Sequence, residues 1–159
     1  MKDDAPDQQG MRCGAASWLL RSALEARKGA DGKGSRTVLV VEDDAPTRRM
    51  FATYLRRRGY EVLEADQGQG ALAMARRAEP GVVVLDVQMP VLDGLTTAEL
   101  LKLDATTAHI PLIAVTGQIF EGGIEEARRY GFAEYLPKPV TPEELARAID
   151  GLFSTTYAS

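Results

Sequence analysis

The sequence predicts an α/β fold in which a parallel sheet is covered by helices on both faces. Strand-like and helical patterns alternate five times between residues 37 and 152, and such alternation is typical of parallel sheets. The valine-rich segments 37–42 and 81–86 are almost continuously apolar, as expected for strands buried on both faces. A chain of 159 residues is also long enough to form one substantial core.

Each expected strand precedes an expected helix. The helix after the first strand is indicated by apolar residues at helical spacing, with arginines on the opposite side: Met50, Phe51, Tyr54 and Leu55. The last helix is expected to have Thr141 as its N-cap and Pro142 in its first turn. The strands are expected at residues 37–42, 60–65, 81–86, 111–116 and 134–136. The helices are expected at residues 46–58, 69–78, 95–103, 121–130 and 142–152.

Five such units fit a flavodoxin-like (βα)5 three-layer sandwich with the strand order 2-1-3-4-5. The composition changes near residue 36, so we expect an N-terminal extension over residues 1–35 and a domain over residues 36–153. Within the extension, residues 17–28 predict a short helix that begins at Ser17, and the glycine-rich residues 29–35 predict a flexible linker. Residues 154–159 are expected to form a tail.

Composition excludes several classes of protein. Nineteen basic and 23 acidic residues give a net charge of −4, which argues against non-specific nucleic-acid binding. The single Cys13 and the single His109 argue against disulfide frameworks and against Cys- or His-based metal sites. No apolar run reaches the length of a membrane span, and the acidic N-terminus does not resemble a signal peptide. A cytoplasmic location is therefore expected.

Polar residues gather where the expected strands end. The first strand ends in Glu42-Asp43-Asp44, the third in Asp86 and the fourth in Thr116, and Lys138 follows the fifth. In open parallel sheets these ends form the active crevice. Oxygen ligands without His or Cys favour Mg²⁺, which binds one or two carboxylates together with phosphate oxygens. The site therefore suits a phosphoryl group, with Asp86 as a nucleophile that forms an aspartyl-phosphate.

These residues belong to four motifs that resemble the receiver domain of two-component response regulators. The resemblance covers residues 36–153, and the four motifs occur in the family's order and spacing. They are TVLVVEDD (37–44), VVVLDVQMPVLDG (82–94), PLIAVTG (111–117) and EYLPKP (134–139).

The resemblance implies a role for each matching residue. Asp86 would be the phosphoacceptor and a ligand of Mg²⁺, with Mn²⁺ as a substitute and no organic cofactor. Asp43 would bind the metal directly, Glu42 through water, and Gln88 through its backbone carbonyl. Gln88 and Gln118 occupy positions that tune the lifetime of the phosphoryl group.

The remaining site residues would form a conformational switch. Thr116 would supply the switch hydroxyl, Tyr135 an aromatic ring that turns inward, and Lys138 a charge that pairs with the phosphoryl group. The Lys138–Pro139 peptide bond is expected to be cis.

The resemblance also implies partners. A sensor histidine kinase or phosphotransfer protein would supply the phosphoryl group, and the domain would catalyse its own phosphorylation and autodephosphorylation without being a turnover enzyme. A downstream protein would bind the face formed by residues 121–130, Tyr135 and residues 143–152. We expect a stand-alone, single-domain regulator that is a monomer or weak dimer, with no direct contact to nucleic acid and no membrane insertion.

Three alternatives remain open on the residues. Residues 68–73 imitate a dinucleotide-binding fingerprint, but they follow the second strand and leave Glu42, Asp43, Thr116 and Lys138 unexplained. A phosphatase of the haloacid-dehalogenase type needs an acid two residues after its nucleophile, where this chain has Gln88. A receiver-like module that binds partners without phosphorylation is the main alternative.

Overall fold

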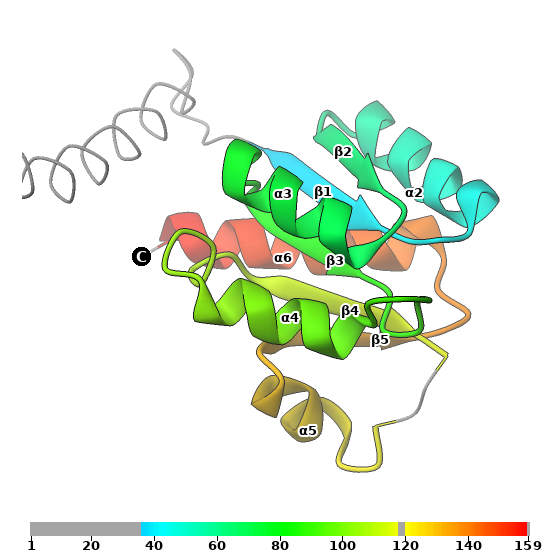
Figure 1. The fold of residues 1–159 in the computed structure, drawn as a ribbon. Helices are drawn as coiled ribbons and strands as arrows, with labels where there is room; N and C mark the ends of the chain where they lie inside the picture. The colour runs from blue at the N-terminus through cyan, green and yellow to red at the C-terminus, as the bar shows by residue number, and fades with distance from the viewer. Residues whose placement is uncertain (1–35, 118–119, 159) are drawn as a thin grey trace, which may run out of the picture. The chain divides into compact units, whose positions relative to one another are not determined.

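The computed structural model describes residues 36–117 and 120–158. The expected helix at 17–28, the linker at 29–35 and Gln118 lie outside the described residues. Within them, strands and helices alternate as the sequence predicts (Figure 1). The strands are β1 (Thr37–Val41), β2 (Glu61–Ala65), β3 (Val82–Leu85), β4 (Leu112–Thr116) and β5 (Phe132–Pro137). The helices are α2 (Ala45–Arg57), α3 (Gly68–Ala78), α4 (Gly94–Leu103), α5 (Gly123–Arg129) and α6 (Pro142–Ala158).

The strands form one sheet in the order β2-β1-β3-β4-β5, and every neighbouring pair is parallel. This arrangement confirms the predicted flavodoxin-like fold. Because all strands run in the same direction, their carboxyl ends lie along one edge of the sheet. We call this edge the carboxyl edge and the opposite one the amino edge.

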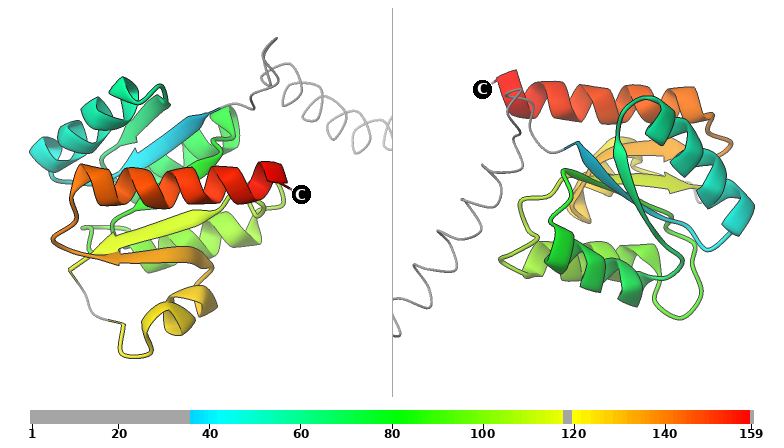
Figure 2. Two further views of the ribbon diagram at one scale, coloured as in Figure 1. Left: turned by 180° about the vertical axis from the view of Figure 1, so that it is seen from behind. Right: turned by 90° about the horizontal axis from the view of Figure 1, so that it is seen from above.

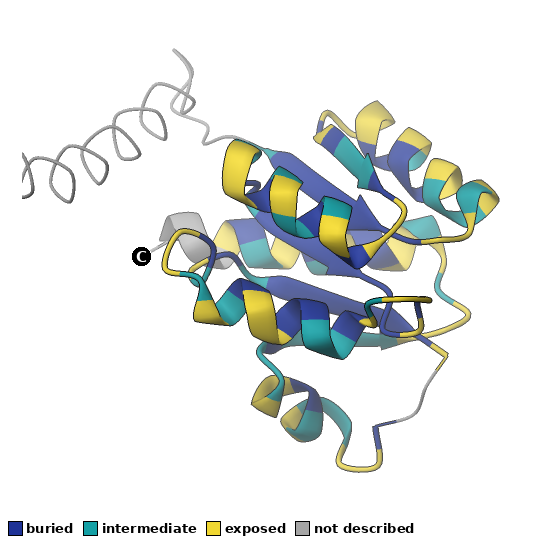
Figure 3. Cartoon of the chain, viewed as in Figure 1, coloured by how far each residue is buried: buried dark blue, intermediate teal, exposed yellow. Residues whose placement is uncertain are grey.

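Two apolar clusters fill the space between the sheet and its two helical layers. In β1, Val38 and Val40 face the cluster that contains the buried residues of α2 and α6. Leu39 and Val41 face the other cluster, which contains the buried residues of α3, α4 and α5. Figure 2 shows the two helical layers, and Figure 3 shows that the central strands are dark blue along their length. The continuous valine runs therefore form strands that are buried on both faces.

Most elements begin and end within one residue of the expected bounds, and three differ by more. Helix α5 begins at Gly123, two residues later than predicted. Strand β5 starts at Phe132, two residues earlier than predicted, because it pairs with β4 around a register shift near Leu112 and Ile113. Helix α6 begins at the predicted N-cap, where Thr141 and Glu144 exchange side-chain and backbone hydrogen bonds. It then continues to Ala158 instead of ending at Leu152, so that residues 154–158 of the expected tail are helical.

Candidate functional site

Three acidic side chains meet at the carboxyl edge of the sheet. One carboxylate oxygen from each of Glu42, Asp43 and Asp86 lies within 4.8 Å of the others. The sheet creates this proximity because β1 and β3 are neighbours, and the Asp86 backbone N–H donates to the carbonyl of Val41 at 3.0 Å. Glu42 and Asp86 are buried, whereas Asp43 is exposed.

Lys138 brings a positive charge to these carboxylates from the end of β5. Its Nζ lies 2.9 Å from Glu42 Oε1 and 3.2 Å from Asp86 Oδ2. The Lys138–Pro139 peptide bond is cis, as predicted, and the Lys138 backbone N–H donates to the carbonyl of Thr116 at 2.9 Å. Residues separated by almost a hundred positions in the sequence therefore share one small site.

The acidic group is only partly neutralised. Burial raises the pKa of Glu42 from 4.5 to about 7, and Asp86 contributes by hydrogen bonding and repulsion while Lys138 opposes the rise. Burial lowers the pKa of Lys138, but the hydrogen bond with Glu42 and the charges of both carboxylates raise it more, to a net value above the usual one. The site therefore favours an added positive charge.

The donor atoms fit a hard divalent cation. All three side chains offer oxygen, which Mg²⁺ prefers. Glu42 Oε2 is buried and, among the described residues, is a side-chain oxygen without a hydrogen-bond partner. A buried acceptor of this kind is costly unless a cation or a water satisfies it. The Gln88 backbone N–H donates to Asp86 Oδ1 at 2.9 Å and fixes the loop that follows the aspartate.

Thr116 and Tyr135 lie on β4 and β5, the two strands that follow β3 in the order of the sheet. Thr116 is the last residue of β4 and is fully buried. The Tyr135 ring, on β5, packs edge-on against Phe120 with ring centroids 5.0 Å apart and is partly buried against the cluster under α3, α4 and α5. Thr116 thus lies at the carboxyl edge, while Tyr135 packs against the core.

The loop between Asp86 and α4 is tightly constrained. A Cβ atom at Gly94 would lie 2.4 Å from the Asp86 carbonyl oxygen, so only glycine fits there. Val91 has a φ of 69° and a side chain 90% exposed, in a turn where the Leu92 N–H donates to the Pro90 carbonyl. A positive φ is strained for a β-branched residue.

Two glycines belong to the dinucleotide-like pattern, and only Gly68 is required by the packing of the fold. A Cβ atom at Gly68 would lie 2.3 Å from Thr97 Oγ1, while one at Gly70 would meet nothing within 4 Å. Gly68 therefore permits close packing of α3 against α4, and this explains the pattern without a nucleotide.

Comparison with known proteins gives the same assignment. Residues 38–150 match the model of the response regulator receiver domain. The chain belongs to this family. The receiver is 35% identical over 121 residues to the phosphate regulon transcriptional regulatory protein PhoB of Pseudomonas aeruginosa, which covers 76% of this chain and 53% of PhoB. It is 34% identical over 107 residues to the polar-differentiation response regulator DivK of Brucella ovis, which covers 67% of this chain and 87% of DivK. The chain thus spans about half the length of PhoB and most of DivK.

Solved structures agree with this family assignment. The receiver superposes on the chemotaxis protein CheY4 of Vibrio cholerae with a TM-score of 0.68 and 30% identity, covering 73% of this chain and 97% of CheY4. It superposes equally well, with a TM-score of 0.68 and 28% identity, on the receiver domain of a Pseudomonas aeruginosa sensor histidine kinase. That match covers 76% of this chain and 98% of the other, which has a magnesium ion coordinated in its active site cleft.

One contact at the site was not predicted from the sequence. Arg48 donates to the backbone carbonyl of Glu42, and it was assigned only to the polar side of its helix. Its position six residues after Glu42 gives no helical or strand periodicity that would have indicated the contact.

Among residues 36–117 and 120–158, none of the helices combines the length and apolar character that a membrane-spanning segment needs.

Proposed function

We propose that this chain is a response regulator that accepts a phosphoryl group onto Asp86 in a Mg²⁺-dependent reaction. The donor is a phosphohistidine on a sensor histidine kinase or a phosphotransfer protein. The observation that carries the proposal is the environment of Asp86, whose carboxylate lies beside Glu42, Asp43 and the ammonium group of Lys138. An aspartate so placed has both a cation-binding site and a positive charge for an incoming phosphoryl group.

The metal ligands follow from the family pattern and the oxygen donors of the site. Asp43 and Asp86 bind Mg²⁺ directly, the backbone carbonyl of Gln88 is a further ligand, and Glu42 acts through water. Mn²⁺ suits the same oxygen set. Bound Mg²⁺ neutralises charge on the transferring phosphoryl group. The magnesium-bound receiver domain of the Pseudomonas sensor kinase supports this assignment.

The transfer of the phosphoryl group is a nucleophilic displacement at phosphorus. A carboxylate oxygen of Asp86 forms a P–O bond while the P–N bond to the donor imidazole breaks, and the electron pair leaves with that nitrogen. Lys138 pairs with the transferred group, and the Gln88 N–H holds the Asp86 carboxylate in orientation. Hydrolysis of the acyl phosphate by water then returns Asp86 to its carboxylate, at a rate that Gln88 and Gln118 tune.

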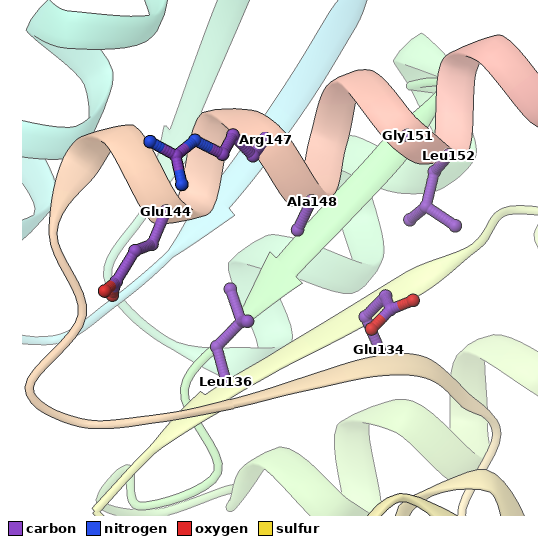
Figure 4. A pocket seen from close by; sticks show the side chains of 7 residues that line it. All are labelled: Glu134, Leu136, Glu144, Arg147, Ala148, Gly151 and Leu152. Carbon is purple, nitrogen blue, oxygen red and sulfur yellow. The ribbon is translucent and has the colours of Figure 1, made fainter.

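Output is proposed to run through protein partners. Phosphorylation shifts an existing equilibrium between two conformers, with Thr116 and Tyr135 as the switch residues. The binding face consists of α5, β5 and α6, and includes a groove of about 540 Å³ between β5 and α6 (Figure 4). The groove is lined by Glu134, Leu136, Glu144, Arg147, Ala148, Gly151 and Leu152. A monomeric or weakly dimeric regulator in the cytoplasm is part of the proposal, and the match to most of DivK supports its central element, the response regulator itself.

Intact-mass measurement tests the phosphorylation step. The protein is incubated with Mg²⁺ and acetyl phosphate, beside Asp86→Ala and Asp44→Asn variants. Asp44 is an exposed neighbour that caps α2 by accepting from the Thr47 N–H, and asparagine preserves a cap. We expect one phosphoryl group on the wild type and on Asp44→Asn, none on Asp86→Ala, and none after chelation of the metal.

Failure of the wild type to gain mass with acetyl phosphate and with a phosphorylated kinase would contradict the proposal. It would favour a module that binds its partner without phosphorylation.

Replacement of Lys138 tests the switch separately from the chemistry. Lys138→Ala removes the ammonium group that contacts Glu42 and Asp86, while Asp86 and the other acidic residues remain. We expect the variant to fold and to be phosphorylated, but to lose the phosphorylation-dependent change in backbone amide signals at Thr116 and Tyr135. An NMR spectrum that changes on phosphorylation as the wild-type spectrum does would argue against the role of Lys138.

A further inference from the structure

The backbone of Glu42 is held by two different parts of the molecule. Its N–H donates to the carbonyl of Ala65 at 3.1 Å, which is the last bond between β1 and the end of β2. Its carbonyl lies beyond the strand, and Arg48 Nη1 donates to it at 2.8 Å. Arg48 lies in the first turns of α2, so the helix supplies the donor at the point where the sheet ends.

Arg48 is itself fixed in place. Its Nε lies 3.4 Å from Glu64 Oε1 on β2, and its side chain is only 16% exposed. Glu64 is held in turn by Arg56, whose Nη2 lies 3.2 Å from Glu64 Oε2 and 3.0 Å from the carbonyl of Val62. The Arg48 guanidinium contacts the Glu42 carbonyl through Nη1 and the Glu64 carboxylate through Nε. A guanidinium held through two different nitrogens has little rotational freedom.

The carbonyl that Arg48 contacts belongs to the peptide that joins Glu42 to Asp43. Rotation of this peptide would move the Asp43 carboxylate away from Asp86, because the Asp43 backbone follows directly. On the far side, Asp44 is fixed by capping α2. The segment that carries two of the three clustered carboxylates is therefore restrained at both ends.

We propose that Arg48 is a positioning residue for the divalent-cation site. By donating to the Glu42 carbonyl, it holds the Glu42–Asp43 peptide in the orientation that groups the carboxylates of Glu42, Asp43 and Asp86. The proposal rests on the proposed function, since it assigns Mg²⁺ to these carboxylates. Among the described residues, the Arg48 side chain contacts the Glu42 carbonyl and Glu64. Hydrogen bonds from Thr47 lower the pKa of Asp44, and the charge of Arg48 also lowers it. The contact of Arg48 with the clustered residues is therefore through the Glu42 backbone.

Electrostatics and positioning predict opposite results when Arg48 is removed. Loss of a cation near three carboxylates makes the local potential more negative, which would tighten Mg²⁺ binding. Loss of a residue that orients the ligands weakens metal binding. The loss is typically 10- to 100-fold for residues that hydrogen-bond to the metal ligands. The direction of the change in affinity therefore distinguishes the two effects.

The test is a Mg²⁺ titration of the full chain by calorimetry, without a phosphodonor, for the wild type, Arg48→Ala and Arg56→Ala. Arg56 is the matched control because it pairs with the same Glu64 but is not the donor to Glu42. We expect Arg48→Ala to bind Mg²⁺ about tenfold more weakly and Arg56→Ala to remain within about twofold of the wild type. Affinity in Arg48→Ala equal to or tighter than the wild type would overturn the proposal.

A second readout does not depend on the metal. In the metal-free protein, NMR order parameters of the amides of residues 42–44 should fall in Arg48→Ala and stay unchanged in Arg56→Ala. Unchanged order parameters in Arg48→Ala would overturn the proposal, whether or not the wild type binds Mg²⁺. Failure of the wild type to bind Mg²⁺ would instead count against the proposed function. If Arg48→Ala does not fold, Arg48→Lys replaces it, because lysine keeps the charge but lacks the planar guanidinium. We expect the same weaker Mg²⁺ binding and the same lower order parameters in this variant. Wild-type values of both quantities would overturn the proposal.

Discussion

At the carboxyl edge of the sheet, the carboxylates of Glu42 and Asp86 share the ammonium group of Lys138, and the Asp43 carboxylate lies beside them. At the amino edge, basic side chains outnumber acidic ones, and they surround the carboxylate of Asp150 on α6. Asp150 accepts hydrogen bonds from Arg58 and from the Tyr60 hydroxyl, and Arg36 lies 3.8 Å away. Both edges bring charged groups from distant parts of the chain together. The carboxyl edge has an excess of negative charge, whereas the amino edge has two guanidinium groups for one carboxylate.

This contrast in charge indicates that the amino edge serves stability and the carboxyl edge serves binding. At the amino edge the Arg36 guanidinium also lies 4.3 Å from the centroid of the Tyr60 ring, and that ring stacks on Phe153. At the carboxyl edge, Glu42 Oε2 has no hydrogen-bond partner within the part of the chain that the structure describes, and Val91 adopts a strained φ. Unfavourable features of this kind persist where a ligand or partner offsets them.

The largest expected effect comes from removing the excess charge at Glu42. With a pKa of 4.5 when unfolded and about 7 when folded, Glu42 binds a proton more tightly in the folded protein. Its contribution to stability is therefore complete below pH 4.5 and is lost as the pH rises to 7. At about 1.4 kcal/mol per pH unit, this loss is about 3 kcal/mol. Glu42→Gln should raise the free energy of unfolding by about that amount at pH 8 without metal.

Urea denaturation at pH 4 and pH 8, with a chelator present, measures this effect. Glu64→Gln is the control, because Glu64 has two arginine partners, and its neutralisation should not stabilise the protein. An equal gain from Glu42→Gln at both pH values would show that charge is not the cause.

The second effect tests whether the amino edge is a stabilising cluster. Asp150→Ala removes an acceptor shared by Arg58 and Tyr60 and should lower the free energy of unfolding by about 2 kcal/mol. Tyr60→Phe keeps the ring contacts and loses only the hydroxyl, so it should cost about 1 kcal/mol. Thermal denaturation of both variants provides the measurement. If Asp150→Ala left the melting temperature unchanged, the contrast between the two edges would fail.

The smallest effect concerns strain at the carboxyl edge. Val91→Gly relieves the positive φ and should stabilise the protein by about 1 kcal/mol after the greater entropy of unfolded glycine is subtracted. Val91→Ala keeps a Cβ atom and should not stabilise it. Because the side chain is 90% exposed, the loss of packing contributes little. Chemical denaturation in which alanine and glycine behave alike would show that the turn is not strained.

Much of the fold was predictable because the relevant signals are local. Buried strands β1 and β3 follow from continuous apolar runs, and the N-cap of α6 follows from Thr141 and the residues after it. The start of β5 and the end of α6 were not predictable, since pairing with β4 and packing on the sheet decide them. The predicted site residues Glu42, Asp43, Asp86 and Lys138 do meet, because strand ends in a parallel sheet share an edge.

The amino-acid order alone places acidic and oxygen-bearing residues where the strands end, and it therefore predicts the chemistry of the carboxyl edge. The distribution of those charges depends on the folded arrangement, since pKa values and unpaired acceptors depend on burial and on neighbours from other elements. The folded arrangement placed the raised pKa on Glu42 and its lysine partner 96 positions away in sequence. It also placed Arg48 against the Glu42 carbonyl, because a donor for a backbone group beyond the sheet is chosen by geometry rather than by periodicity.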